Sequence, residues 1–143
     1  MKKFLTIIFI PAISFAQPGC ESVGASMETE LFYKLSKELK IDTSGIDEYK
    51  AKVELINISP ISKAYATYLA KLDHEESLSK SKVTLPESEY FSSYYENEVK
   101  SITAQYTYFN KDKKKAVFIA TSLMNKDECS IRFNGYITLS REF

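Results

Sequence analysis

A four-residue spacing of apolar positions marks the first regular element of the chain. Between Ser22 and Lys40 every fourth position is apolar, and six charged side chains fill the opposite face. The apolar series is Val23, Met27, Leu31, Leu35 and Leu39. Because four residues are close to one turn of an α-helix, this spacing predicts an amphipathic helix with one buried face.

The pattern changes to a period of two after a short turn. Asp42-Thr43-Ser44-Gly45 has the composition of a turn, and from Glu48 to Leu55 apolar and charged positions alternate. Alternation of this kind predicts a strand with one buried face, which carries Tyr49, Ala51, Val53 and Leu55.

A second helix is predicted from Ser59 to about Leu72. Ser59-Pro60 fits a helix start, with serine as the N-cap and proline at the first helical position. Apolar residues then follow at helical spacing up to Leu72. The residues from Ala64 to Leu72 also alternate, so a strand that pairs with the preceding one remains an alternative.

The second half of the chain is predicted to end in three strands. A polar stretch over residues 73–86 is typical of a surface connection, and residues 89–98 lack a clean period, which indicates irregular structure or a short helix. Strand patterns cover residues 100–109, 116–123 and 129–139, separated by turn compositions at 110–113 and 125–128. These three segments predict an antiparallel meander.

The order of these elements predicts an α+β domain. The N-terminal amphipathic helix is expected to pack across a curved antiparallel sheet that ends in the three-stranded meander. No internal repeat or domain boundary is visible after residue 17, so residues 17–143 are expected to form one domain.

Residues 1–16 have the composition of a secretory signal peptide. Lys2 and Lys3 precede the apolar run Phe4 to Ile10, and Ser14-Phe15-Ala16 forms a small-x-small cleavage site. The run is too short for a membrane span, which needs about 20 residues. We therefore expect an exported domain, periplasmic or secreted, that starts at Gln17 and has no membrane span after cleavage.

Two cysteines, Cys20 and Cys129, remain after the signal peptide. An even number of cysteines in an oxidising compartment predicts one disulfide. This bond would join the start of the exported domain to the beginning of its last strand.

Composition excludes several function classes. Basic and acidic residues are balanced at 19 each, with only two arginines, so the clustered positive charge that nucleic-acid binding needs is missing. The four glycines are too scattered for a nucleotide-binding loop, and the single histidine, His74, excludes sites built on several histidines. We expect no cofactor, no metal and no nucleic-acid partner.

An aromatic and acidic segment is the candidate binding site for a protein partner. Its residues are Tyr90, Phe91, Tyr94, Tyr95, Glu96 and Glu98. Aromatic rings among charged and small polar residues are typical of recognition surfaces. Carboxylates beside aromatic rings also occur in glycosidases, with Glu89, Glu96 or Glu98 as the acid and base of that alternative.

The segment Ser44-Gly45-Ile46-Asp47-Glu48-Tyr49 resembles the Ser-Gly followed by Tyr of bacterial periplasmic lysozyme inhibitors, in which a loop plugs the lysozyme cleft. Those inhibitors are all-β, whereas this chain opens with a helix, so we do not assign the chain to them. The resemblance does illustrate how a small exported domain can act by occluding an enzyme.

The sequence thus favours a non-catalytic exported binding protein, an inhibitor or immunity protein that occludes a toxin or a cell-wall hydrolase. One alternative is a small ligand-binding domain or cell-wall glycoside hydrolase. Another is a subunit of a pilus or secretion apparatus, because the edge of a meander can pair with a further chain.

Overall fold

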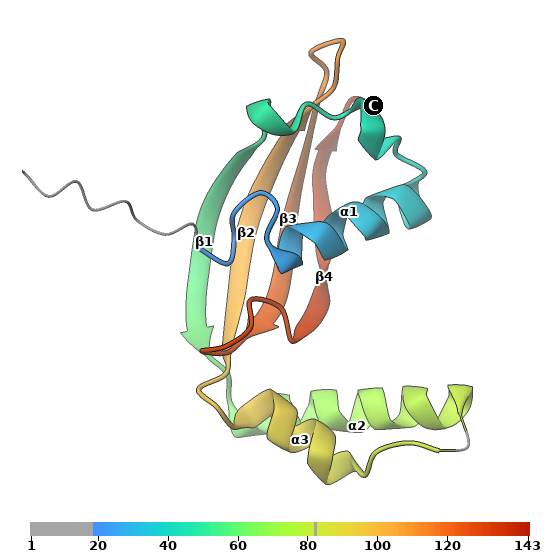
Figure 1. Ribbon diagram of the computed structural model, residues 1–143, viewed down its shortest axis with the longest axis vertical. Helices are drawn as coiled ribbons and strands as arrows, with labels where there is room; N and C mark the ends of the chain where they lie inside the picture. The colour runs from blue at the N-terminus through green and yellow to red at the C-terminus, as the bar shows by residue number, and fades with distance from the viewer. Residues whose placement is uncertain (1–18, 82) are drawn as a thin grey trace, which may run out of the picture.

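The computed structural model describes residues 19–81 and 83–143. The predicted signal peptide over residues 1–16, and Gln17 after it, lie outside the described residues. Three helices and a four-stranded antiparallel sheet of order β1-β2-β3-β4 make an α+β fold, as predicted (Figure 1). The elements are α1 (Ser26–Leu39), the short 3-10 turns η1 (Thr43–Gly45) and η2 (Glu48–Lys50), β1 (Lys52–Pro60), α2 (Lys63–Lys80), α3 (Glu87–Tyr95), β2 (Lys100–Phe109), β3 (Lys115–Met124) and β4 (Arg132–Arg141).

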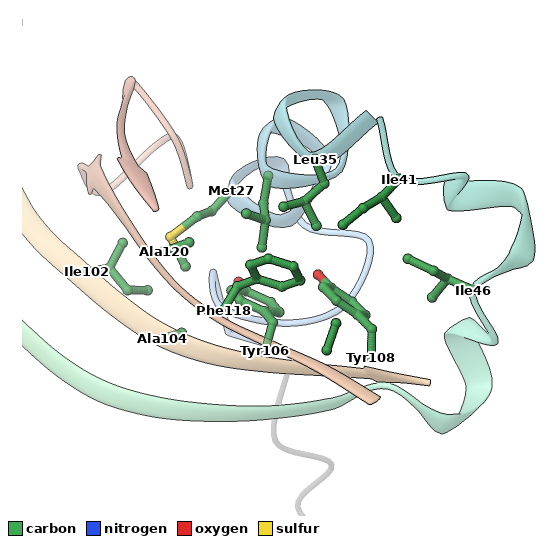
Figure 2. Close-up of a cluster of buried hydrophobic side chains, with 12 residues drawn as sticks. Met27, Leu35, Ile41, Ile46, Ile102, Ala104, Tyr106, Tyr108, Phe118 and Ala120 are labelled. Atoms are coloured by element: carbon green, nitrogen blue, oxygen red, sulfur yellow. The ribbon is translucent and has the colours of Figure 1, made fainter. Parts of the chain in front are cut away.

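Helix α1 lies across one face of the sheet and buries the face that its spacing predicts. Met27, Leu31 and Leu35 are fully buried, and Figure 2 shows Met27 and Leu35 pointing toward the sheet. The helix ends at Leu39, and the left-handed backbone of the cap residue Lys40 (φ 57°) turns the chain so that the N–H of Ile41 donates to the carbonyl of Leu35 at 3.3 Å. The predicted helix-on-sheet packing is therefore confirmed.

Two buried tyrosines of β2 form hydrogen bonds with α1 and with the turn that precedes it. Tyr106 and Tyr108 are fully buried, with parallel rings 6.1 Å apart. The Tyr106 hydroxyl donates to the carbonyl of Glu21 (2.7 Å), and the Tyr108 hydroxyl donates to the buried carboxylate of Glu28 (3.0 Å). Glu28 also accepts the N–H of Gly24, so these bonds fix the turn that precedes α1 onto the sheet.

We expect Tyr108→Phe to lower the free energy of unfolding by about 1 to 2 kcal/mol, because the buried Glu28 carboxylate loses a donor. Tyr136→Phe is the matched control, since the Tyr136 hydroxyl donates to the exposed Glu38 and its loss should cost less than about 0.5 kcal/mol. Urea unfolding of both variants measures the difference. Equal losses would contradict a special role for the buried bond.

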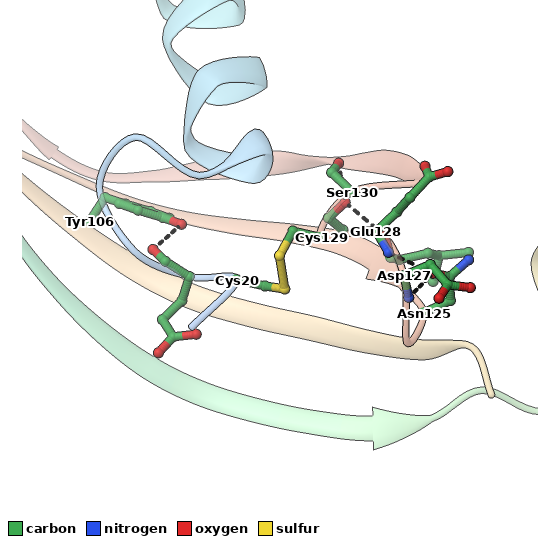
Figure 3. The surroundings of a disulfide bond; sticks show 10 residues. Cys20, Tyr106, Asn125, Asp127, Glu128, Cys129 and Ser130 are labelled. Atoms are coloured by element: carbon green, nitrogen blue, oxygen red, sulfur yellow. Dashed lines mark hydrogen bonds between the residues drawn. A yellow bond between two sulfur atoms is a disulfide. The ribbon is translucent and has the colours of Figure 1, made fainter. Parts of the chain in front are cut away.

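The predicted disulfide is present and joins two segments that are distant in sequence. Cys20 lies in the turn before α1 and Cys129 in the connection between β3 and β4, with their Cα atoms 4.9 Å apart (Figure 3). This connection is also ordered by Asn125, whose side-chain oxygen accepts the N–H groups of Asp127 and Glu128, at 2.8 Å each.

The bounds of β1 and the start of α2 differ from the sequence predictions. Tyr49 lies in the 3-10 turn η2, fully exposed, and the first strand begins only at Lys52. Ser59 and Pro60 end β1 instead of starting a helix, because β1 stays paired with β2 up to Pro60. The N-cap of α2 is Ser62, whose side-chain hydroxyl accepts a hydrogen bond from the N–H of Tyr65.

The segment after Ser62 is helical, so the alternative of a strand over residues 64–72 is wrong. Helix α2 continues past Leu72 to Lys80, through most of the segment that was predicted to be a polar connection. Side chains four residues apart form ion pairs in this part, Lys71 with Glu75 and Glu76 with Lys80, and such pairs support a helix whose surface is polar.

Candidate functional site

Helices α2 and α3 form a hairpin that lies at one end of the sheet, whereas α1 covers one of the faces of the sheet (Figure 1). A small apolar cluster holds the hairpin together and reaches the sheet through Leu123 of β3. The other buried members of this cluster are Ala66, Leu69, Ala70, Tyr94 and Val99. The candidate binding residues of the sequence lie on α3 and on the turn that follows it.

Asp73 of α2 connects the hairpin to β4. Its carboxylate accepts two hydrogen bonds from the Arg132 guanidinium, at 2.7 and 2.8 Å, and one from the Tyr94 hydroxyl at 2.5 Å. Partial burial disfavours the charged carboxylate, but these bonds and the charge of Arg132 outweigh burial and lower the pKa of Asp73. The three side chains therefore form an ionised link between α2, α3 and the sheet.

The candidate binding residues divide into an inner and an outer group. Tyr94 is buried and faces Asp73, and burial raises the pKa of its hydroxyl. Tyr90 is half-buried, with its hydroxyl 3.3 Å from the Thr84 hydroxyl. Tyr94 therefore serves the attachment of α3, and its ring is not accessible to a partner.

The outer group consists of Phe91 and Tyr95 on α3 and of Glu96 and Glu98 in the turn that follows it. The rings of Phe91 and Tyr95 stack at 5.3 Å, and Tyr95 is 42% exposed. Glu96 and Glu98 follow in an exposed turn in which Asn97 and Glu98 have left-handed backbone (φ 63° and 57°). The end of α3 and the turn after it thus carry two stacked rings and two exposed carboxylates.

A cleft of about 490 Å³ separates the end of α3 from the turn between β3 and β4. It is lined by Ser92, Ser93, Glu96, Asn97, Asn125, Glu128 and Ile131. We call it the acidic cleft. The Asn97 amide donates to the carboxylate of Asp127 at 2.8 Å and so links the two turns on either side of the cleft.

Helix α2 carries exposed apolar residues among those whose spacing predicts the helix. Tyr65, Tyr68 and Leu72 are 38, 57 and 38% exposed. Their spacing of three and four residues is the signal that predicted the helix, and spacing alone does not show whether another element covers a helix face. Leu69 and Ala70, in the same segment, supply the buried contacts instead.

The segment from Ser44 to Tyr49 forms the turns η1 and η2 near the opposite end of the sheet. Ser44 donates its backbone N–H and its hydroxyl to the carboxylate of Asp42, which closes the first turn. These bonds lower the pKa of Asp42. Tyr49 extends fully into solvent.

Within residues 19–81 and 83–143, no group of three histidine, cysteine, aspartate or glutamate side chains is placed to hold a metal ion. No helix among these residues has both the length and the apolar character of a membrane span. The comparison of the chain with family models, curated proteins and solved structures finds no match.

Proposed function

We propose that this chain is an exported, non-catalytic binding protein, an inhibitor or immunity protein that occludes a toxin or a cell-wall hydrolase. The single observation that carries the proposal is the outer surface of α3, where the Phe91–Tyr95 stack adjoins Glu96. Exposed aromatic rings supply much of the binding energy in protein interfaces, and carboxylates favour a basic partner.

The charge of α3 supports a cationic partner. Residues 87–98 contain four glutamates and no lysine or arginine, and all four glutamates are exposed. An acidic surface accelerates association with a positively charged partner and disfavours acidic ones. Partners of this kind are consistent with the envelope, where the Cys20–Cys129 disulfide would be kept oxidised.

The way α3 is held also supports binding. The Asp73–Arg132 pair fixes the α2–α3 hairpin to the sheet. The disulfide connects the β3–β4 connection covalently to the turn before α1. A surface that is ordered before binding loses less conformational entropy when a partner docks.

We test the proposal by adding purified residues 17–143 to envelope extracts that degrade cell walls. We expect the protein to retain a hydrolase or toxin on an affinity column and to reduce its activity. The variant Tyr95→Ala, Glu96→Ala should weaken inhibition about tenfold or more, because it removes an aromatic contact and a charge from the proposed interface.

The control is Tyr33→Ala, Glu30→Ala, which removes an exposed tyrosine and an exposed glutamate from α1. This variant should inhibit as well as the wild-type protein. Failure of the wild-type protein to retain any envelope partner would refute the proposal, and equal inhibition by the two variants would place the interface elsewhere.

A further inference from the structure

We propose that copies of this chain associate head to tail, with the lysine-rich turn between β2 and β3 of one copy docking into the acidic cleft of the next. The proposal does not depend on the function proposed above. It follows from the opposite charges of the β2–β3 turn and the acidic cleft, which lies beside the β3–β4 connection. Figure 1 shows these two connections at opposite ends of the sheet.

The first surface is the β2–β3 turn, which projects beyond the rest of the sheet (Figure 1). Residues 110–115 contain four lysines and one aspartate, and all five of these side chains are exposed. Within the described part of the chain, neither Lys113 nor Lys114 takes part in an ion pair. Their ammonium groups are therefore available to carboxylates of another molecule.

The turn is ordered before any contact is made. The side-chain oxygen of Asn110 accepts the N–H groups of Asp112 (3.0 Å) and Lys114 (2.9 Å), and Lys113 has left-handed backbone (φ 62°). The backbone N–H of Lys113 donates to the carbonyl of Asn110. Docking such a turn costs little backbone entropy, since its backbone bonds are already formed.

The second surface is the acidic cleft with the two turns beside it. Residues 96–98 and 125–128 contain four carboxylates and one lysine. No ion pair among the described residues involves the carboxylates of Glu96 or Glu128, which line the cleft. The link between Asn97 and Asp127 holds the two turns in place, so the cleft also has its shape before a contact forms.

Charge and position together favour a second copy as the occupant. The basic turn has an excess of three positive charges, and the turns around the cleft have an excess of three negative charges. The stacked rings of Phe91 and Tyr95 lie on the same end of α3, and aromatic rings attract ammonium groups. Because the turn and the cleft lie at opposite ends of the sheet, each copy keeps one free turn or one free cleft after a contact forms, and repeated contacts give an open chain of copies.

Sedimentation velocity at increasing concentration of residues 17–143 provides the test. We expect the average mass to rise with concentration at about 20 mM salt and to return to that of a monomer at about 0.5 M, because salt screens exposed charges. The variant Lys113→Glu, Lys114→Glu and the variant Glu96→Lys, Glu128→Lys should each weaken association about tenfold or more.

An equimolar mixture of the two variants should associate again, because each reversed surface then meets a surface of opposite charge. The control Lys34→Glu, Lys37→Glu makes the same change in net charge on α1 and should still associate. A wild-type protein that stays monomeric at low salt up to about 0.5 mM overturns the proposal. The proposal is also overturned if either charge-reversal variant associates as strongly as the wild-type protein, or if the mixture of the two variants stays monomeric.

Discussion

Reduction of the Cys20–Cys129 disulfide is expected to lower the free energy of unfolding by about 4 to 5 kcal/mol, the largest effect that we predict for a single change. The two cysteines are 109 residues apart, so the bond greatly restricts the unfolded chain. Loss of this restriction makes unfolding more favourable even where the folded contacts stay the same. Urea unfolding with and without a reducing agent measures the effect.

The double variant Cys20→Ala, Cys129→Ala separates the bond from the reducing agent. Its stability should match that of the reduced wild-type protein, and it should not respond to reduction. A loss below about 1 kcal/mol in the variant would contradict the expectation and indicate that the unfolded chain is already compact.

Arg132→Met is expected to lower the free energy of unfolding by about 3 kcal/mol, because it leaves the Asp73 carboxylate partly buried without its cation. The side chains of Arg132 and Asp73 are only 21 and 18% exposed. Lys34→Met is the matched control, since it breaks the exposed pair with Glu38 and should cost less than about 0.5 kcal/mol. Chemical unfolding of both variants gives the comparison.

The same pair makes stability depend on pH. The pKa of Asp73 is lower in the folded protein than in the unfolded chain, where an aspartate has a pKa of about 3.9. Its contribution is therefore complete above that value and is lost as the pH falls through the lower, folded pKa. We expect the wild-type protein to lose more stability than Asp73→Asn below about pH 4, and parallel pH profiles would contradict this.

The elements that could be predicted from the sequence are those with a regular period. Helix α1 has apolar residues at every fourth position, and the buried positions of β2 alternate without interruption from Ile102 to Tyr108. The apolar period does not predict the last turns of α2, because ion pairs between side chains such as Glu76 and Lys80 support them. Helix α3 has too few turns to show a period.

The sequence predicts which segment carries the candidate binding residues, but it does not predict which of their side chains are buried. Composition selects residues 90–98, but the orientation of α3 decides that Tyr94 faces inward and Tyr95 outward. The partner of Tyr94, Asp73, is 21 residues away, and Arg132 is 59 residues from Asp73, so no local pattern connects them. The acidic cleft likewise requires two turns that only the folded chain brings together.

The position of the disulfide makes most of the polypeptide a covalent ring. Residues 20 to 129 form a closed loop, with short tails outside it. A protease that cuts the connection between α2 and α3, where Val83 is 85% exposed, would open the ring without separating the fragments. The two fragments would stay joined on a non-reducing gel and separate into two bands only after reduction, so a single cut in this connection is visible only when thiols are present.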